Sequence, residues 1–197
     1  MDTNTATTTE VLQQNIRQQR QKTDNQSYAS LLKKWEYHFR DRIDKILLDA
    51  HLFDFPITFE PFEKYFSGFD FQYFTFDNSD HKDLHGFYEV EDALIKIYYA
   101  DNCVGSRQRF TIAHELMHVY QYFDHEFQVD IEAIISPVIR KLLIERLADK
   151  SAAYYLAPLP LMAVQAQKTC NAIQLAATFS ISPRAAEICL SDYGLCT

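Results

Sequence analysis

The stretch His114-Glu115-Leu116-Met117-His118 decides how the rest of the chain is interpreted. Residues four apart on an α-helix lie ~6 Å apart along its axis and on nearly the same face, so two imidazoles at this spacing can hold one metal ion. Glu115 follows the first histidine, where its carboxylate can reach a water on the ion and act as a general base. The spacing therefore predicts a zinc site on a helix, with His114 and His118 as ligands.

A catalytic zinc site needs a third protein ligand and an open position for water. Glu145 is the candidate, because it lies in a second segment with helical character that begins at Ser136-Pro137 and stops before Pro158. Asp149, four residues later on the same face, is expected to accept the free N–H of a ligating histidine. The alternative is that Glu145 and Asp149 form a solvated i, i+4 pair.

The remaining pattern predicts an α+β fold that is mostly helical, with a small antiparallel sheet beside the helix of the zinc motif. Apolar residues at three- and four-residue steps indicate an amphipathic helix near residues 28–52. We expect Ser106 to cap the motif helix, which would begin at Arg107. The expected strands lie near residues 69–76, 86–90 and 93–99, the last two forming a hairpin whose second strand offers a free edge to a substrate.

Composition limits the domain count and the partners. With 197 residues and 47% hydrophobic residues, the chain can bury one core. We expect residues 1–26 to form a disordered or weakly helical polar tail. Residues 27–197 should form a single domain with a helix-turn-helix-like helical portion from about residue 161. A net charge of −8 disfavours direct nucleic-acid binding.

Targeting signals and cysteine spacing bear on location. No stretch approaches the ~18 apolar residues of a membrane span, and the start has no signal-peptide pattern, so we expect a cytoplasmic protein without membrane contact. The four cysteines, at positions 103, 170, 189 and 196, contain no Cys-x-x-Cys pair. They are therefore expected to be free thiols.

Two segments resemble the ImmA/IrrE family of zinc metallopeptidases. Residues 107–118, RQRFTIAHELMH, are similar to the family pattern Arg-x-Arg-Phe-Thr-x-Ala-His-Glu-Leu-Gly-His, and residues 145–158, ERLADKSAAYYLAP, to its Glu-x-x-Ala-Asp segment. Met117, Ser151 and Ala157 depart from the pattern without touching the expected ligands. The resemblance implies a zincin-like core with Zn²⁺ bound by His114, His118 and Glu145.

The resemblance also implies an intracellular endopeptidase that cleaves a DNA-binding repressor, with a helix-turn-helix protein as partner. The alternative is a non-proteolytic, zinc-bound regulator that binds and sequesters the repressor. A third possibility, a structural zinc site, would usually fill all four positions with Cys and His. The residue that stabilises the developing negative charge stays open among Tyr122, His125, Tyr154 and Tyr155.

Overall fold

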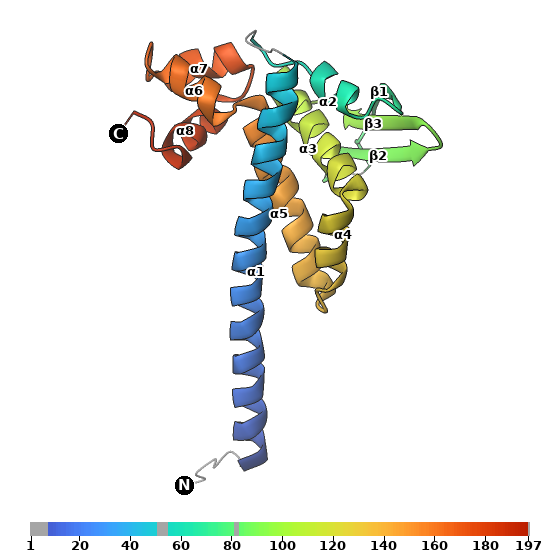
Figure 1. The fold of residues 1–197 in the computed structure, drawn as a ribbon, viewed down its shortest axis with the longest axis vertical. Helices are drawn as coiled ribbons and strands as arrows, with labels where there is room; N and C mark the ends of the chain where they lie inside the picture. Colours follow the sequence, from blue (N-terminus) through green and yellow to red (C-terminus); the bar gives the residue numbers. More distant parts are fainter. Residues whose placement is uncertain (1–7, 51–54, 81–82, 197) are drawn as a thin grey trace.

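The computed structural model describes residues 8–50, 55–80 and 83–196, and side chains from Tyr28 onward. The expected α+β class is confirmed: helices dominate, and a small sheet lies at one side of the molecule (Figure 1). The elements, in chain order, are α1 (Thr8–Asp49), α2 (Glu60–Tyr65), β1 (Asp70–Phe76), β2 (Gly86–Glu91), β3 (Leu94–Ala100), α3 (Gly105–Phe123), α4 (His125–Glu132), α5 (Pro137–Leu156), α6 (Leu159–Ala166), α7 (Ala172–Phe179) and α8 (Pro183–Asp192).

The first helix, α1, carries the apolar stripe that the sequence predicts. Trp35, Phe39 and Ile43 recur at four-residue steps and are at most 3% exposed. The helix packs against α5. A hydrogen bond joins the two helices, because the hydroxyl of Tyr154 on α5 donates to Asp44 Oδ1 on α1 over 2.9 Å.

The backbone of α1 is helical from Thr8, so it includes residues 8–26, where a disordered or weakly helical tail was expected. Figure 1 shows this N-terminal part extending away from the other elements. Residues 1–7 of that tail lie outside the described part of the chain. The expected single domain from residue 27 onward stays a prediction.

The sheet has the order β1-β3-β2, with β3 parallel to β1 and antiparallel to β2. It is therefore mixed, not wholly antiparallel as predicted. Ile95 and Ile97 of β3 are fully buried. The expected free edge at residues 94–99 is wrong, because both sides of β3 carry a neighbouring strand. The alternation of apolar and polar residues along β3 predicts which residues lie on each face of the strand. It does not reveal that a strand 24 residues earlier in the chain pairs with it.

Helices α3 and α5 pack against each other at the centre of the molecule. Ala148 and Ala152 on α5 are fully buried, as expected for small residues that let two helices approach closely. The predicted start of α5 is confirmed, since Ser136 Oγ accepts from the Ile139 N–H. The predicted cap of α3 is wrong: the helix begins at Gly105 after Val104, so Ser106 lies inside its first turn.

Helix α4, which was not expected from the sequence, follows α3 almost directly. The Asp124 carboxylate accepts from the Phe127 N–H and so caps its first turn. The Phe127 ring is fully buried, with its centroid 5.1 Å from that of Trp35. This helix therefore covers the part of α1 that carries Trp35.

The C-terminal portion consists of α6, α7 and α8, as expected from residue 161 onward. α7 and α8 are joined by a short turn in which Ser180 is left-handed (φ 52°). The expectation of four free thiols is wrong at two positions, because Cys170 and Cys196 form a disulfide. The chain after α8 turns back, with the Leu195 N–H donating to Leu190 O, and this return brings the two cysteines together.

Apolar packing joins these elements into one cluster, which extends from Trp35 on α1 to Leu190 on α8. The α3–α5 pair lies within it, so the two helices that carry the zinc-site candidates are held by buried side chains on several sides. Among the described residues, none of the helices is both long and apolar enough to cross a membrane.

Candidate metal centre

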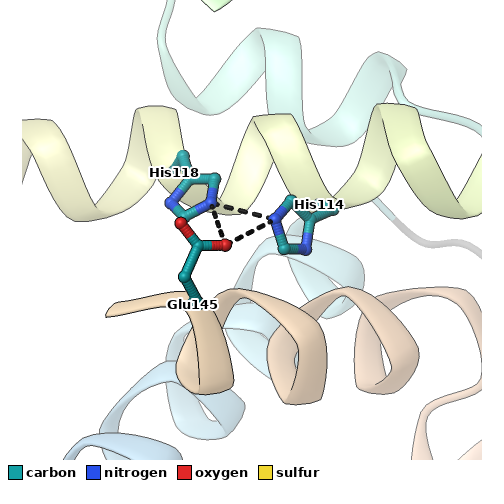
Figure 2. A group of neighbouring side chains, drawn as sticks. All are labelled: His114, His118 and Glu145. Carbon is teal, nitrogen blue, oxygen red and sulfur yellow. Dashed lines mark hydrogen bonds and ion pairs between the residues drawn. The ribbon is translucent and has the colours of Figure 1, made fainter. Parts of the chain in front are cut away.

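Three side chains from two helices converge between α3 and α5 (Figure 2). His114 Nε2 and His118 Nε2 lie 2.9 Å apart. Glu145 Oε2 lies 3.5 Å from the His114 nitrogen and 3.6 Å from the His118 nitrogen. The structure therefore brings together the three residues that the sequence predicts as ligands, with Glu145 reaching across from α5.

The size of this triangle fits a tetrahedral metal ion. Nitrogen and oxygen ligands ~2.1 Å from such an ion lie about 3.4 Å from one another. The observed separations of 2.9, 3.5 and 3.6 Å lie on both sides of that value. Two imidazoles and one carboxylate also leave a fourth coordination position free, as a catalytic metal requires.

Asp149 lies beside the outer nitrogen of His114, but without the hydrogen bond that the sequence predicts. Its Oδ1 atom is 3.0 Å from the buried His114 Nδ1, at ion-pair distance but out of line for a hydrogen bond. Burial lowers the pKa of His114, but Asp149, Glu115 and Glu145 outweigh it and raise that pKa above its usual value. The side chains of Glu145 and Asp149 are about half exposed, but each carboxylate also lies within 3.5 Å of a ring nitrogen of His114, which a purely solvated pair would not.

Gln121 is a residue of the site that the sequence analysis missed. Its side chain is almost fully buried, with 2% of the residue exposed. Its Oε1 lies 2.9 Å from His118 Nδ1, and its Nε2 donates to Ile144 O over 3.0 Å. The available signal was its position three residues after His118, on the same helix face.

Glu115 lies on α3 between the two histidines and is 7% exposed. Burial raises the pKa of its carboxyl to about 7, against the neighbouring His114, which lowers it. A carboxyl group with a pKa near neutrality can both take and return a proton around pH 7. These properties suit a general base, and that role of Glu115 stays a prediction.

The triad opens into a cleft of about 820 Å³ between β2, α3 and α5. The segment from His85 to Tyr88, at the start of β2, forms one wall, and α5 around Lys141 and Ile144 forms another. In the described part of the chain β2 is an outer strand of the sheet. An unpaired strand edge thus lies along the same cleft as the metal-ligand triad.

A glycine allows β2 to approach α3 this closely. A Cβ atom at Gly86 would overlap the methyl group of Thr111 and lie 3.0 Å from both Glu115 Oε1 and Tyr98 O. The absence of a side chain at Gly86 therefore sets the distance between the strand and the carboxylate of Glu115.

The four residues considered as donors to a developing negative charge do not line the cleft. The Tyr155 hydroxyl donates to Thr58 O over 2.8 Å, and that of Tyr154 to Asp44. The cleft wall offers His85 and Tyr88 instead. Both come from β2 and the residue before it, a segment far from the motif in sequence.

Comparisons with known proteins bear on the fold. Neither a protein-family model nor a curated protein matches the sequence. Among solved structures, a Mycobacterium tuberculosis transcriptional regulator is similar with a TM-score of 0.57 and 12% identity, covering 81% of this chain and 50% of the regulator. The chain thus spans half the length of that protein. At this identity the similarity shows a shared fold.

Proposed function

We propose that this protein is a zinc-dependent endopeptidase of the ImmA/IrrE type. The observation that carries the proposal is the triangle of His114, His118 and Glu145, with the buried Glu115 beside it in an open cleft. The His₂Glu donor set is the one that zinc peptidases use. The resemblance of residues 107–118 and 145–158 to that family supports the same assignment.

The proposed chemistry assigns proton transfer to Glu115. A bound zinc ion would supply Lewis acidity, which lowers the pKa of water and polarises a peptide carbonyl. The Glu115 carboxylate takes a proton from the attacking water and later delivers it to the leaving amine. His114, His118 and Glu145 would hold the ion, and Asp149, at ion-pair distance from His114 Nδ1, would help to orient that ring.

The edge of β2 is the proposed binding site for the substrate backbone. An extended peptide can add to an unpaired strand through main-chain hydrogen bonds. β2 provides such an edge at the cleft, whereas β3, the strand expected from sequence, is covered on both sides. A peptide paired with β2 would pass along the cleft in front of the metal triad.

Tyr88 is the proposed donor to the negative charge that develops on the substrate carbonyl. It lines the cleft, and its ring lies 6.5 Å from that of His118 between centroids, nearly parallel to it. Burial, together with Glu115, raises the pKa of Tyr88. Its hydroxyl group therefore keeps its proton and stays able to donate.

The proposed substrate is a helix-turn-helix repressor, and the proposed location is the cytoplasm. Both follow from the family resemblance of the zinc motif, and both belong to this proposal. The second candidate function, sequestration of a repressor without cleavage, would use the same zinc-bound fold. Glu115 favours cleavage, because a pure binding protein has no use for a buried carboxylate at this position.

The deciding experiment combines cleavage with repressor inhibition. The purified protein is incubated with a helix-turn-helix repressor co-encoded with it, the proposed substrate, with and without a zinc chelator, and fragments are identified by mass spectrometry. Glu115→Gln should reduce the cleavage rate by at least about a hundredfold, since general-base catalysis contributes factors of about 10² to 10⁴. Glu187→Gln, an exposed carboxylate paired with Arg184 on α8, is the matched control and should cleave normally.

The outcomes separate the two functions. Cleavage that survives Glu115→Gln would contradict the general-base assignment. Relief of repression that survives this substitution would support sequestration instead. Glu145→Ala should lose most of the bound zinc, measured by elemental analysis beside Glu187→Ala. Full retention of zinc would remove Glu145 from the site.

A further inference from the structure

The outer nitrogens of the two histidine ligands have different partners. His114 Nδ1 faces the carboxylate of Asp149, whose side chain is 49% exposed. His118 Nδ1 faces the amide oxygen of Gln121, which belongs to a residue that is only 2% exposed. The partner of His118 is thus a buried, neutral amide, whereas the partner of His114 is a half-exposed carboxylate. Only the carboxylate adds charge to the site.

The other end of the Gln121 amide decides how that amide is oriented. Ile144 O is a backbone carbonyl, which can only accept, so the group 3.0 Å from it must be the amide N–H₂ of Gln121. The amide oxygen then necessarily faces His118 Nδ1, 2.9 Å away. Because that oxygen can only accept, His118 must carry a proton on Nδ1.

A proton on Nδ1 of a neutral imidazole leaves the lone pair on Nε2. His118 Nε2 is the atom that lies in the metal triangle, 3.6 Å from Glu145 Oε2. The orientation of one amide therefore selects the tautomer that a metal ligand needs. Ile144, the acceptor at the far end, directly precedes Glu145 in α5. The same side chain thus links a ligand of α3 to the backbone beside the ligand of α5.

We propose that Gln121 is a positioning residue of the metal centre: it fixes His118 as the Nδ1–H tautomer and ties that ring to α5 next to Glu145. The proposal rests on the metal site of the proposed function, and not on peptide cleavage. The nearby Gln128 contacts only the main chain of Gln121, since its Nε2 donates to the Gln121 backbone oxygen over 2.7 Å. The amide of Gln121 is neutral, so only the carboxylates of the site would offset the positive charge of a bound ion.

Three variants separate tautomer selection from packing. Gln121→Leu removes both amide contacts at similar volume. Gln121→Glu keeps an acceptor for His118 Nδ1 but cannot donate to Ile144 O. Gln128→Leu is the matched control, because it removes a neighbouring glutamine whose amide contacts Gln121 O and neither histidine. All are made in the full-length protein.

The first measurement is the tautomer of His118 in the metal-free protein, obtained from long-range ¹H–¹⁵N spectra of the imidazole. The wild type and Gln128→Leu should show the Nδ1–H form, and Gln121→Glu should keep it. Gln121→Leu should lose this preference. A wild-type His118 with its proton on Nε2 would overturn the proposal, whether or not the protein cleaves any peptide.

The second measurement is the affinity for Zn²⁺ in competition with a fluorescent chelator. Gln121→Leu should bind about 10- to 100-fold more weakly than the wild type, the usual effect of removing a partner of a ligating histidine. Gln121→Glu should recover most of this loss, and Gln128→Leu should bind as the wild type does. Equal losses in Gln121→Leu and Gln128→Leu would indicate a packing effect and overturn the proposal. Should Gln121→Leu fail to fold, the wild-type tautomer and Gln121→Glu still decide the question.

Discussion

At the scale of single residues, Glu115 combines an ionisable group with an environment that excludes water. The residue is 7% exposed, and burial raises the pKa of its carboxyl to about 7 from a usual value near 4.5. The same burial that suits proton transfer near pH 7 disfavours the charged form. This carboxylate should therefore cost stability when no metal ion is bound.

This cost predicts a pH-dependent effect of Glu115→Gln in metal-free protein. The pKa of the Glu115 carboxyl is raised from 4.5 to about 7 in the folded protein. Its contribution to the free energy of unfolding is therefore fully present below pH 4.5 and is lost as the pH rises through about 7. Between pH 5 and pH 8 the wild type should therefore lose about 2 to 3 kcal/mol of unfolding free energy relative to Glu115→Gln. Urea denaturation in the presence of chelator measures the difference. Parallel pH profiles for the two proteins would contradict the pKa shift, and Glu187→Gln should run parallel to the wild type.

At the scale of elements, the contact between β2 and α3 places the strand edge beside the catalytic candidates. Gly86 makes that contact possible, because any side chain there meets Thr111, Glu115 and the backbone of Tyr98. The position of the cleft wall therefore depends on one residue without a side chain. A sequence pattern of alternating residues does not indicate this requirement.

We expect Gly86→Ala to destabilise the protein by about 1 to 3 kcal/mol, the usual cost of inserting a methyl group into a packed interface. Gly86→Ala combined with Thr111→Ser should recover part of the loss, since the overlapping methyl group of Thr111 is removed. Gly68→Ala is the control, because a Cβ there meets nothing within 4 Å. Urea denaturation of the four proteins measures the effect. A double variant no more stable than Gly86→Ala would show that Thr111 is not the obstacle.

At the scale of the whole molecule, the disulfide between Cys170 and Cys196 closes the C-terminal helices onto themselves. It joins the segment between α6 and α7 to the chain after α8, over a sequence separation of 26 residues. Such a link restricts the unfolded chain more than the folded one. The stability of this portion should therefore depend on the redox conditions.

Cys170→Ser should lower the unfolding free energy by about 3.5 kcal/mol, the chain-entropy value for a loop of this length. For a protein of this size that corresponds to a decrease in Tm of about 7 to 14 °C. Calorimetry without reductant measures it, with Cys103→Ser as control, since Cys103 is a free thiol. Reductant should bring the wild type to the Tm of Cys170→Ser. An unchanged wild-type Tm in reductant would contradict a stabilising role.

Local patterns predicted much of this protein. The four-residue spacing of His114 and His118, the polar cap at Ser136 and the turn near Ser180 each depend on residues within a few positions of one another. Helix periodicity and capping are short-range effects, so one sequence is enough to recognise them. The proposed ligand role of Glu145 also came from the sequence, through the family resemblance of its segment and its place on a second helix.

Only the tertiary structure decided the remainder. The strand that pairs with β3, the wall that carries Tyr88, the partner of Cys170 and the acceptor of the Gln121 amide all depend on residues far apart in the chain. Such contacts are set by how the helices and strands pack, and they leave no periodic signal in the sequence. The sequence by itself therefore determined which residues can hold a metal ion, whereas packing determined how their ring nitrogens are held and which strand edge faces them.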